Sequence, residues 1–309
     1  MSITRGSFGL NIDPSAKDVK VAFELAQLAD TTGFGFVGVQ DHLYHPQFLD
    51  AWTFLTALAS ATKNVTVMSN VATTALRPPA LLIKAASTLS LLSDGRVALG
   101  VGAGAMSEGI AAYGGAQRTT PETVAAFEEA MNVMRMLRDP EVRSARVSGE
   151  YYQLRGAHPG PLPGQPVPIL VGSYGPRMLE ITGRLGDGWL PTSAYAPPSV
   201  AGQMNLAIDK AAEDAQRDPR EIVRIYNVMG SITDDNGAGR DDTQARVIGS
   251  AQYWIDSLAS FRDDLGFDSF LFWPVEADPL EQATRFAQEV LPAFATVANK
   301  GDSLTNGRK

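Results

Sequence analysis

The sequence predicts a single (β/α)₈ barrel, the TIM-barrel form of the α/β class. Short strand-like segments alternate with longer amphipathic segments almost from end to end, eight times over. Most strand-like segments are continuously apolar rather than alternating, as expected for parallel strands covered on both faces. A length of 309 residues is ordinary for such a barrel in one domain. An open, doubly wound sheet is the alternative architecture.

The elements follow one another in a regular order. The strand-like segments span residues 8–12, 34–39, 65–70, 97–101, 168–171, 188–190, 223–229 and 269–273. The helical segments span residues 17–32, 49–61, 80–92, 121–138, 176–185, 198–216, 243–265 and 279–295. The first helix ends at Gly33, a favourable stop, and two later helices open with Pro121 and Pro279, each preceded by a residue that can cap a helix.

One segment interrupts this rhythm. Residues 139–165 form an insertion that is rich in Pro and Gly and far longer than an ordinary connection. Two interpretations stand side by side, a lid or specificity loop at the barrel mouth and a structural flap on its side. We expect one barrel domain over residues 1–298 and a disordered polar tail over residues 299–309.

Composition excludes several classes of function. The chain contains no cysteine and three histidines, which excludes disulfides and thiolate metal sites and leaves little material for a zinc site, so we expect no metal. The formal net charge of −8 argues against nucleic-acid or anionic-membrane binding. No apolar run approaches the length of a membrane span or a signal peptide. We therefore expect a cytoplasmic enzyme that acts on a small molecule.

Barrel enzymes build their sites from the residues that follow each strand. The turn after the fifth strand is the best phosphate candidate, because glycine lets backbone N–H groups approach an anion and the following helix adds its positive N-terminal end. This turn comprises Gly172, Ser173, Tyr174, Gly175, Pro176 and Arg177. The alternative is a tight turn in which glycine serves a positive φ and Arg177 is solvated.

Two further strand ends offer candidate residues. The run GVGAG at residues 100–104 presents bare backbone that suits either a flat ring or close strand–helix packing. His42 follows the second strand and can bond a ligand or exchange a proton near neutral pH. Asp41 points to the opposite side of the strand, so direct pairing with His42 is not expected. Because no ready nucleophile accompanies the glycines, the pattern favours chemistry carried by a bound cofactor.

Four motifs in order resemble the luciferase-like monooxygenase superfamily. They are GFGFVGVQDHLY, VTVMSNVATTALRPPALLIKAASTLSLLSDGRVALGVGAG, PVPILVGSYGPRMLEITGRLGDGWLPT and LGFDSFLFWP, which together cover nearly the whole chain. The segment GSYGPRMLEITGRLGDG is most similar to the branch that uses a deazaflavin, coenzyme F-420 (F420), whereas a sister branch binds FMN and activates oxygen. The resemblance therefore implies an oxidoreductase on a barrel.

The resemblance also implies roles for individual residues. The turn from Gly172 to Arg177 would hold the cofactor phosphate, and Asp41 and His42 would be the cofactor-facing acid and the catalytic histidine. Gly102 and Gly104 would lie beside the ring system. The cofactor-binding set implied in this way also includes the end of the third strand, Ser69, Asn70 and Val71. Members often carry a non-prolyl cis peptide there, which would fall at Asn70–Val71.

Three functions follow as hypotheses. The first is F420-dependent hydride transfer to or from a small organic substrate. The second is an FMN-dependent monooxygenase supplied with reduced flavin by a separate reductase, and the third is a non-catalytic flavin-binding paralogue. Family habit suggests a homodimer. Sugar-phosphate oxidation is not expected, because Ala105 stands where the glucose-6-phosphate dehydrogenase type has an acid and its basic cluster has no match here.

Overall fold

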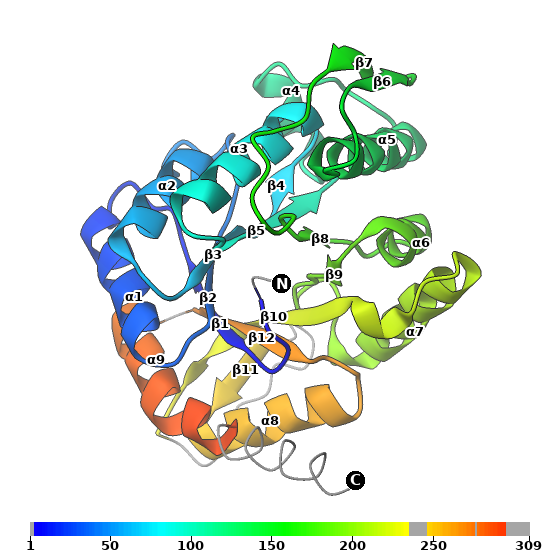
Figure 1. Cartoon of the computed structure of the whole chain (residues 1–309). Helices are drawn as coiled ribbons and strands as arrows, with labels where there is room; N and C mark the ends of the chain where they lie inside the picture. Colours follow the sequence, from blue (N-terminus) through cyan, green and yellow to red (C-terminus); the bar gives the residue numbers. More distant parts are fainter. Residues whose placement is uncertain (1–2, 235–245, 276, 295–309) are drawn as a thin grey trace, which may run out of the picture.

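The structure is a computed structural model that describes residues 3–234, 246–275 and 277–294 (Figure 1). The expected tail over residues 299–309 lies outside these described residues, as do residues 295–298 at the end of the predicted domain. Within the described ranges, no helix combines the length and the apolar character that crossing a bilayer requires.

Eight parallel strands close into a barrel, which confirms the predicted fold class. In chain order they are β1 (Phe8–Ile12), β2 (Phe36–Val39), β3 (Thr66–Ser69), β5 (Val97–Gly102), β8 (Ile169–Val171), β9 (Gly188–Trp189), β10 (Val223–Ile232) and β12 (Ser269–Pro274). Each strand pairs with the next, and the pairing of β12 with β1 closes the ring. The short β4 (Ala72–Thr73) adds to β5. Because all strands run the same way, their carboxyl ends share one mouth.

Helices surround the barrel (Figure 1). They are α1 (Val19–Thr31), α2 (Ala51–Ala61), α3 (Pro79–Leu92), α4 (Ser107–Ala112), α5 (Thr120–Arg138), α6 (Pro176–Leu185), α7 (Pro198–Asp214), α8 (Ala251–Asp263) and α9 (Pro279–Arg285), with a single 3₁₀ turn at Pro219–Glu221 and a π-helical turn at Phe286–Val290.

The helix expected over residues 243–265 begins later than predicted. Residues 243–245 lie outside the described residues, and β11 (Arg246–Gly249) extends the sheet beside β10. Ser250 then caps α8, because its hydroxyl accepts a hydrogen bond from the backbone N–H of Tyr253 at 3.3 Å. Sequence periodicity alone did not separate this short strand from the helix that follows it.

The insertion contains an antiparallel hairpin, β6 (Ala145–Ser148) and β7 (Gln153–Ala157). Its turn is anchored to α5 by the carboxylate of Glu129, which accepts the backbone N–H groups of Glu150, Tyr151 and Tyr152 at 2.8, 2.9 and 3.0 Å. Three charge-assisted hydrogen bonds to one carboxylate fix the turn against the barrel wall.

Two apolar layers hold the fold together. The larger one fills the space between the strands and the surrounding helices. The smaller one fills the barrel interior with Phe36, Met68, Ala98, Leu170, Leu190, Val223, Ile225 and Leu271. This inner layer plugs the barrel, so any ligand site must lie above it at the mouth.

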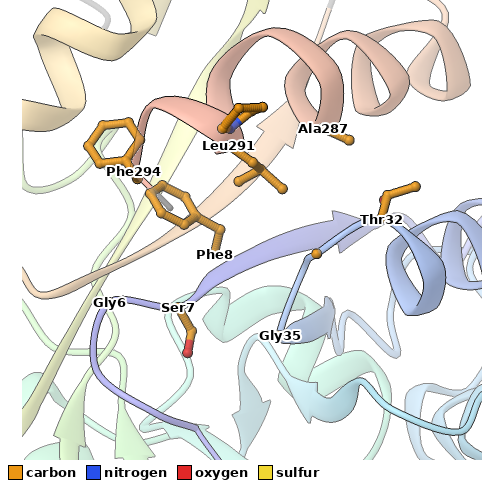
Figure 2. Close-up of a pocket in the computed structure, with 10 residues that line it drawn as sticks. Gly6, Ser7, Phe8, Thr32, Gly35, Ala287, Leu291 and Phe294 are labelled. Atoms are coloured by element: carbon orange, nitrogen blue, oxygen red, sulfur yellow. The ribbon is translucent and has the colours of Figure 1, made fainter. Parts of the chain in front are cut away.

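Figure 2 shows a hollow at the opposite end, beside the amino ends of β1 and β2. It has a volume of about 450 Å³, and Phe8, Leu291 and Phe294 are among the residues that line it. None of its lining residues is charged. The amino end of a TIM barrel serves stability rather than chemistry, so we do not place the active site there.

Replacement of Gly100 by alanine tests how tightly β3 and β5 approach. A Cβ atom at Gly100 would lie 2.0 Å from the Ser69 carbonyl oxygen, whereas one at Gly164 would meet nothing within 4 Å. We expect Gly100→Ala to lower the free energy of unfolding by about 1–3 kcal/mol in denaturant titrations. Gly164→Ala is the matched control and should stay within about 0.5 kcal/mol of the parent. Equal stability of the two variants would contradict this packing.

Candidate active site

The barrel mouth divides into a polar half and a bare half. Because side chains alternate along a strand, residues two or four positions after the inner apolar layer also face the interior, nearer the mouth. These inward positions hold Gly38, Asn70, Gly100, Gly102, Gly172, Thr192, Asn227 and Trp273, and β1 contributes Asn11. Glycine thus occupies the inward positions of β5 and β8 and also that of β2, where Gly38 lies between polar neighbours, while polar or aromatic side chains occupy those of β1, β3, β9, β10 and β12.

Val71 fills the space that these glycines leave. The peptide bond Asn70–Val71 is cis, as predicted. A Cβ atom at Gly102 would lie 3.0 Å from a methyl group of Val71, and one at Gly172 would lie 3.2 Å from it. The half-buried Val71 side chain therefore packs on the bare backbone of β5 and β8. We call Val71, Gly102 and Gly172 together the valine shelf.

Two of the predicted cofactor residues serve this local architecture. Ser69 is fully buried and its hydroxyl donates to the Gly100 carbonyl at 2.8 Å, which ties β3 to β5. Gly104 has a φ of +94°, and a Cβ atom there would lie 2.6 Å from the Thr73 hydroxyl. Its glycine is therefore required by backbone conformation and packing alone.

The turn from Gly172 to Arg177 lies next to the strand-end glycines. The Gly172 N–H donates to the Val101 carbonyl at 2.9 Å, so this turn and Gly102 share one edge of the mouth. Ser173 is buried and its hydroxyl is 2.8 Å from that of Thr182. The Tyr174 hydroxyl accepts the Thr192 N–H at 3.2 Å. These two side chains are bonded within the protein, whereas Gly175, Pro176 and Arg177 are exposed.

The exposed end of this turn can bind an anion. Gly175 is the N-cap of α6, where no side chain caps the helix. Its φ is −78°, and a Cβ atom there would meet nothing within 4 Å. Conformation and packing therefore do not require glycine at this position. The small residue leaves room for a ligand phosphate to reach the first N–H groups of α6.

His42 stands at the end of β2, on the polar half. Its Nδ1 atom is 2.7 Å from the Tyr44 hydroxyl, and the ring is half-buried. Burial lowers the pKa of His42 below its ordinary value, although the negative charges of Asp41 and Asp13 oppose the shift. The imidazole is therefore neutral at pH 7, a form that can accept a proton.

Asp41 is engaged in an ion pair. It is 3% exposed, and both of its oxygens accept hydrogen bonds from Arg77, at 2.7 Å from Nε and 2.9 Å from Nη2. Arg77 also pairs with Asp50 at the start of α2. Asp41 thus joins the end of β2 to the turn before α3. Its contact with a cofactor stays a prediction.

Asp13 is a candidate that the sequence did not single out. It follows β1 and accepts hydrogen bonds from Gln40 at 2.5 Å and Asn11 at 3.2 Å, while Asn70 donates to Asn11 at 3.0 Å. Solvent reaches Asp13 through the mouth, but the surrounding protein desolvates it enough to raise its carboxyl pKa, despite these hydrogen bonds. His42 is a candidate because it is a polar residue that follows the end of a strand, and Asp13 satisfies the same criterion.

The titration of His42 tests these electrostatics. The chain has only three histidines, so an NMR titration resolves each one. We expect His42 to titrate below 6.5, the ordinary pKa of a histidine. Asp13→Asn should move its pKa further down, because the negative charge that favours the imidazolium is removed. Asp214→Asn, on the exposed face of α7, is the control. A pKa above 6.5, or one unchanged by Asp13→Asn, would contradict the assignment.

Comparison with known proteins agrees with this geometry. The family model described as luciferase-like monooxygenase matches residues 4–298. The chain is 31% identical over 284 residues to an F420-dependent glucose-6-phosphate dehydrogenase of Mycolicibacterium smegmatis, which covers 86% of this chain and 83% of the relative. Among solved structures, it resembles an F420-dependent secondary alcohol dehydrogenase in complex with an F420-acetone adduct, with a TM-score of 0.83, 22% identity and coverage of 94% of this chain and 99% of the other.

A monooxygenase from Streptomyces bottropensis has the same fold, with a TM-score of 0.78, 22% identity and coverage of 93% of this chain and 99% of the other. The family model spans the barrel strands and both the valine shelf and the α6 turn. The chain belongs to the luciferase-like monooxygenase family.

Proposed function

We propose that the protein is an F420-dependent oxidoreductase that transfers a hydride to or from a small organic substrate. The relatives at about 30% identity are F420-dependent enzymes, which supports the coenzyme. The observation that carries the proposal is the valine shelf beside an uncapped helix N-terminus, with a neutral histidine at the end of β2 in the same mouth. A planar ring and a phosphate require such a combination.

The residues present fit the coenzyme. Val71 presents an apolar surface at the level of the strand ends, against which a flat ring can pack, and the α6 turn offers N–H groups to a phosphate. When bound, the deazaflavin supplies a ring carbon that accepts or gives up the hydride. The shelf residues hold no titratable group, so their contribution is placement and exclusion of water.

His42 handles the proton that accompanies the hydride. In the direction of oxidation, a neutral imidazole accepts the proton of a substrate hydroxyl, and in reduction the imidazolium returns it. Tyr44 bonds Nδ1, so Nε2 is the nitrogen left for substrate. The nearby charge of Asp13 stabilises the imidazolium that forms. Alcohols and carbonyl compounds are the substrate class that this arrangement serves.

The alternative is an FMN-dependent monooxygenase. The structural similarity to a monooxygenase of the same fold supports this alternative function. Reduced FMN would have to come from a separate reductase, and oxygen would replace the second substrate. The sequence predicts a cytoplasmic location, and we propose the same location for both functions.

Turnover with each coenzyme tests the proposal. We expect a member of an alcohol panel to reduce F420, or a member of a ketone panel to oxidise its reduced form, as followed by the absorbance of the coenzyme. His42→Gln should lower kcat by about 10²–10⁴-fold, because proton transfer is lost, while F420 affinity changes little. Oxidation should also slow as the pH falls through the His42 pKa. Oxygen-dependent formation of an oxygenated product with reduced FMN, and no change in F420 with any substrate, would establish the alternative.

We also propose a homodimer through the outer face of α3. Leu81, Leu91 and Leu92 are 65, 47 and 73% exposed. Positions eleven residues apart lie close together around a helix, so Leu81 and Leu92 share one face with Leu91 at its border, and Lys84 and Thr88 stand between them. We call Leu81, Leu91 and Leu92 the stripe. An exposed apolar stripe of this kind marks a protein contact.

Introducing charged side chains into the stripe tests the proposed dimer interface. The double substitution Leu81→Glu and Leu92→Glu should convert a dimer into a monomer in light scattering, because two carboxylates per copy cannot be buried unpaired. Leu206→Glu on α7 is the matched control, since Leu206 is 68% exposed but stands outside the stripe. The proposed interface would be contradicted by a monomeric wild-type protein, or by a dimer that persists after both Glu substitutions.

A further inference from the structure

Arg118 stands at the rim of the mouth, in the connection between β5 and α5. The same connection includes α4, where a Cβ atom at Gly109 would lie 2.6 Å from the Tyr44 ring, so α4 packs directly on the partner of His42. Arg118 itself follows α4 and precedes Thr119, the N-cap of α5. The connection thus begins at the glycines of β5 and ends at this arginine.

Two tyrosines of the insertion hold the guanidinium. Its central carbon lies 5.1 Å from the centre of the Tyr151 ring, the geometry of a cation–π contact. The charge of Arg118 and a hydrogen bond from it also act on the Tyr152 hydroxyl. Both tyrosines lie in the hairpin turn that Glu129 anchors, so the guanidinium rests on a fixed support.

A short chain of hydrogen bonds connects this support to the shelf. The Tyr152 hydroxyl donates to the Thr74 carbonyl at 3.1 Å, and the Thr74 N–H donates to the Gly102 carbonyl at 3.1 Å. Arg118 therefore lies on the β5 side of the mouth, whereas the α6 N-terminus follows β8. An anion at Arg118 would be a second one, apart from the phosphate at α6.

No ion-pair contact joins Arg118 to a carboxylate within the described part of the chain, although its charge helps to lower the pKa of Glu122. The nearest carboxylates serve other donors. Glu122 accepts from the N–H and the hydroxyl of Thr119, both at 2.7 Å, and the oxygens of Glu129 accept the hairpin N–H groups. A half-buried guanidinium without an ion pair, stacked on one ring and bonded at another, is prepared for an external carboxylate or phosphate.

We propose that Arg118, supported by Tyr151 and Tyr152, is an anion-binding subsite that recognises a carboxylate or phosphate on the ligand in the mouth. The anion belongs either to the substrate or to the coenzyme. Its placement beside the shelf rests on the proposed function, but its affinity for anions does not. The planar guanidinium favours two parallel hydrogen bonds to such a group.

The test compares Arg118→Gln with Arg155→Gln, which removes an exposed arginine of β7 in the same insertion. The first probe is inorganic phosphate alone, followed by the rise in Tm at constant ionic strength. Arg118→Gln should lose a large part of that rise and Arg155→Gln none. Equal rises in all three proteins would overturn the subsite, whether or not F420 binds.

The second measurement identifies the source of the anion. Fluorescence titrations use F420 and its phosphate-free deazaflavin fragment. A loss of tenfold or more in F420 affinity in Arg118→Gln, with the fragment unaffected, assigns the anion to the coenzyme. The anion belongs to the substrate if Arg118→Gln binds F420 and the fragment as tightly as the wild-type protein does. In that case KM should rise tenfold for acidic substrates only, while kcat stays unchanged. Equal weakening of F420 and the fragment, or no effect on either coenzyme or on KM, contradicts the proposal. Failure of the wild-type protein to bind F420 would instead refute the proposed function.

Discussion

The contact between Val71 and the glycines of β5 and β8 is the constraint on which the site depends. A methyl group of Val71 would stand 3.0 Å from a Cβ atom at position 102 and 3.2 Å from one at position 172, so a side chain at either position would displace the valine by a few tenths of an ångström. The peptide bond before it, Asn70–Val71, is cis. A firm apolar shelf at the level of the strand ends is the result, and the position of a planar ligand follows from it.

The polar half of the mouth completes the arrangement by controlling charge. Burial keeps His42 neutral, and the carboxylate beside it, Asp41, is neutralised by Arg77. Asp13 supplies a second negative charge from the neighbouring strand. Burial disfavours the imidazolium in the free protein, and the negative charges of Asp41 and Asp13 offset part of that cost when the reaction delivers a proton. Hydride transfer and proton transfer therefore depend on different residues of one opening, the valine shelf and His42.

Much of this site could be predicted from local sequence. The strand ends, the α6 turn and the cis bond lie within short motifs, and parallel strands bring their carboxyl ends together without further information. The purpose of the glycines could not be predicted, because it depends on Val71, which lies about thirty residues before Gly102 and about a hundred before Gly172. Asp41 and Arg77 are also distant in sequence, so their pairing appeared only in three dimensions.

Short strands were the second feature that could not be predicted from the sequence. Residues 246–249 continue the pattern of the helix that follows, and only pairing with β10 makes them a strand. The hairpin in the insertion likewise depends on Glu129 of α5, which no pattern within residues 139–165 reveals. Nothing in those residues alone indicated that Tyr151 and Tyr152 would meet Arg118. Tertiary contacts of this kind decide where an insertion lies.

The position of the coenzyme ring relative to Val71 tests the central claim most directly. Titration of F420 into protein labelled with ¹³C at valine methyl groups should shift the Val71 resonances strongly, with nuclear Overhauser effects to the protons of the deazaflavin ring. Binding that leaves the Val71 methyl groups unshifted, while valines elsewhere respond, would show that the ring rests somewhere other than this shelf.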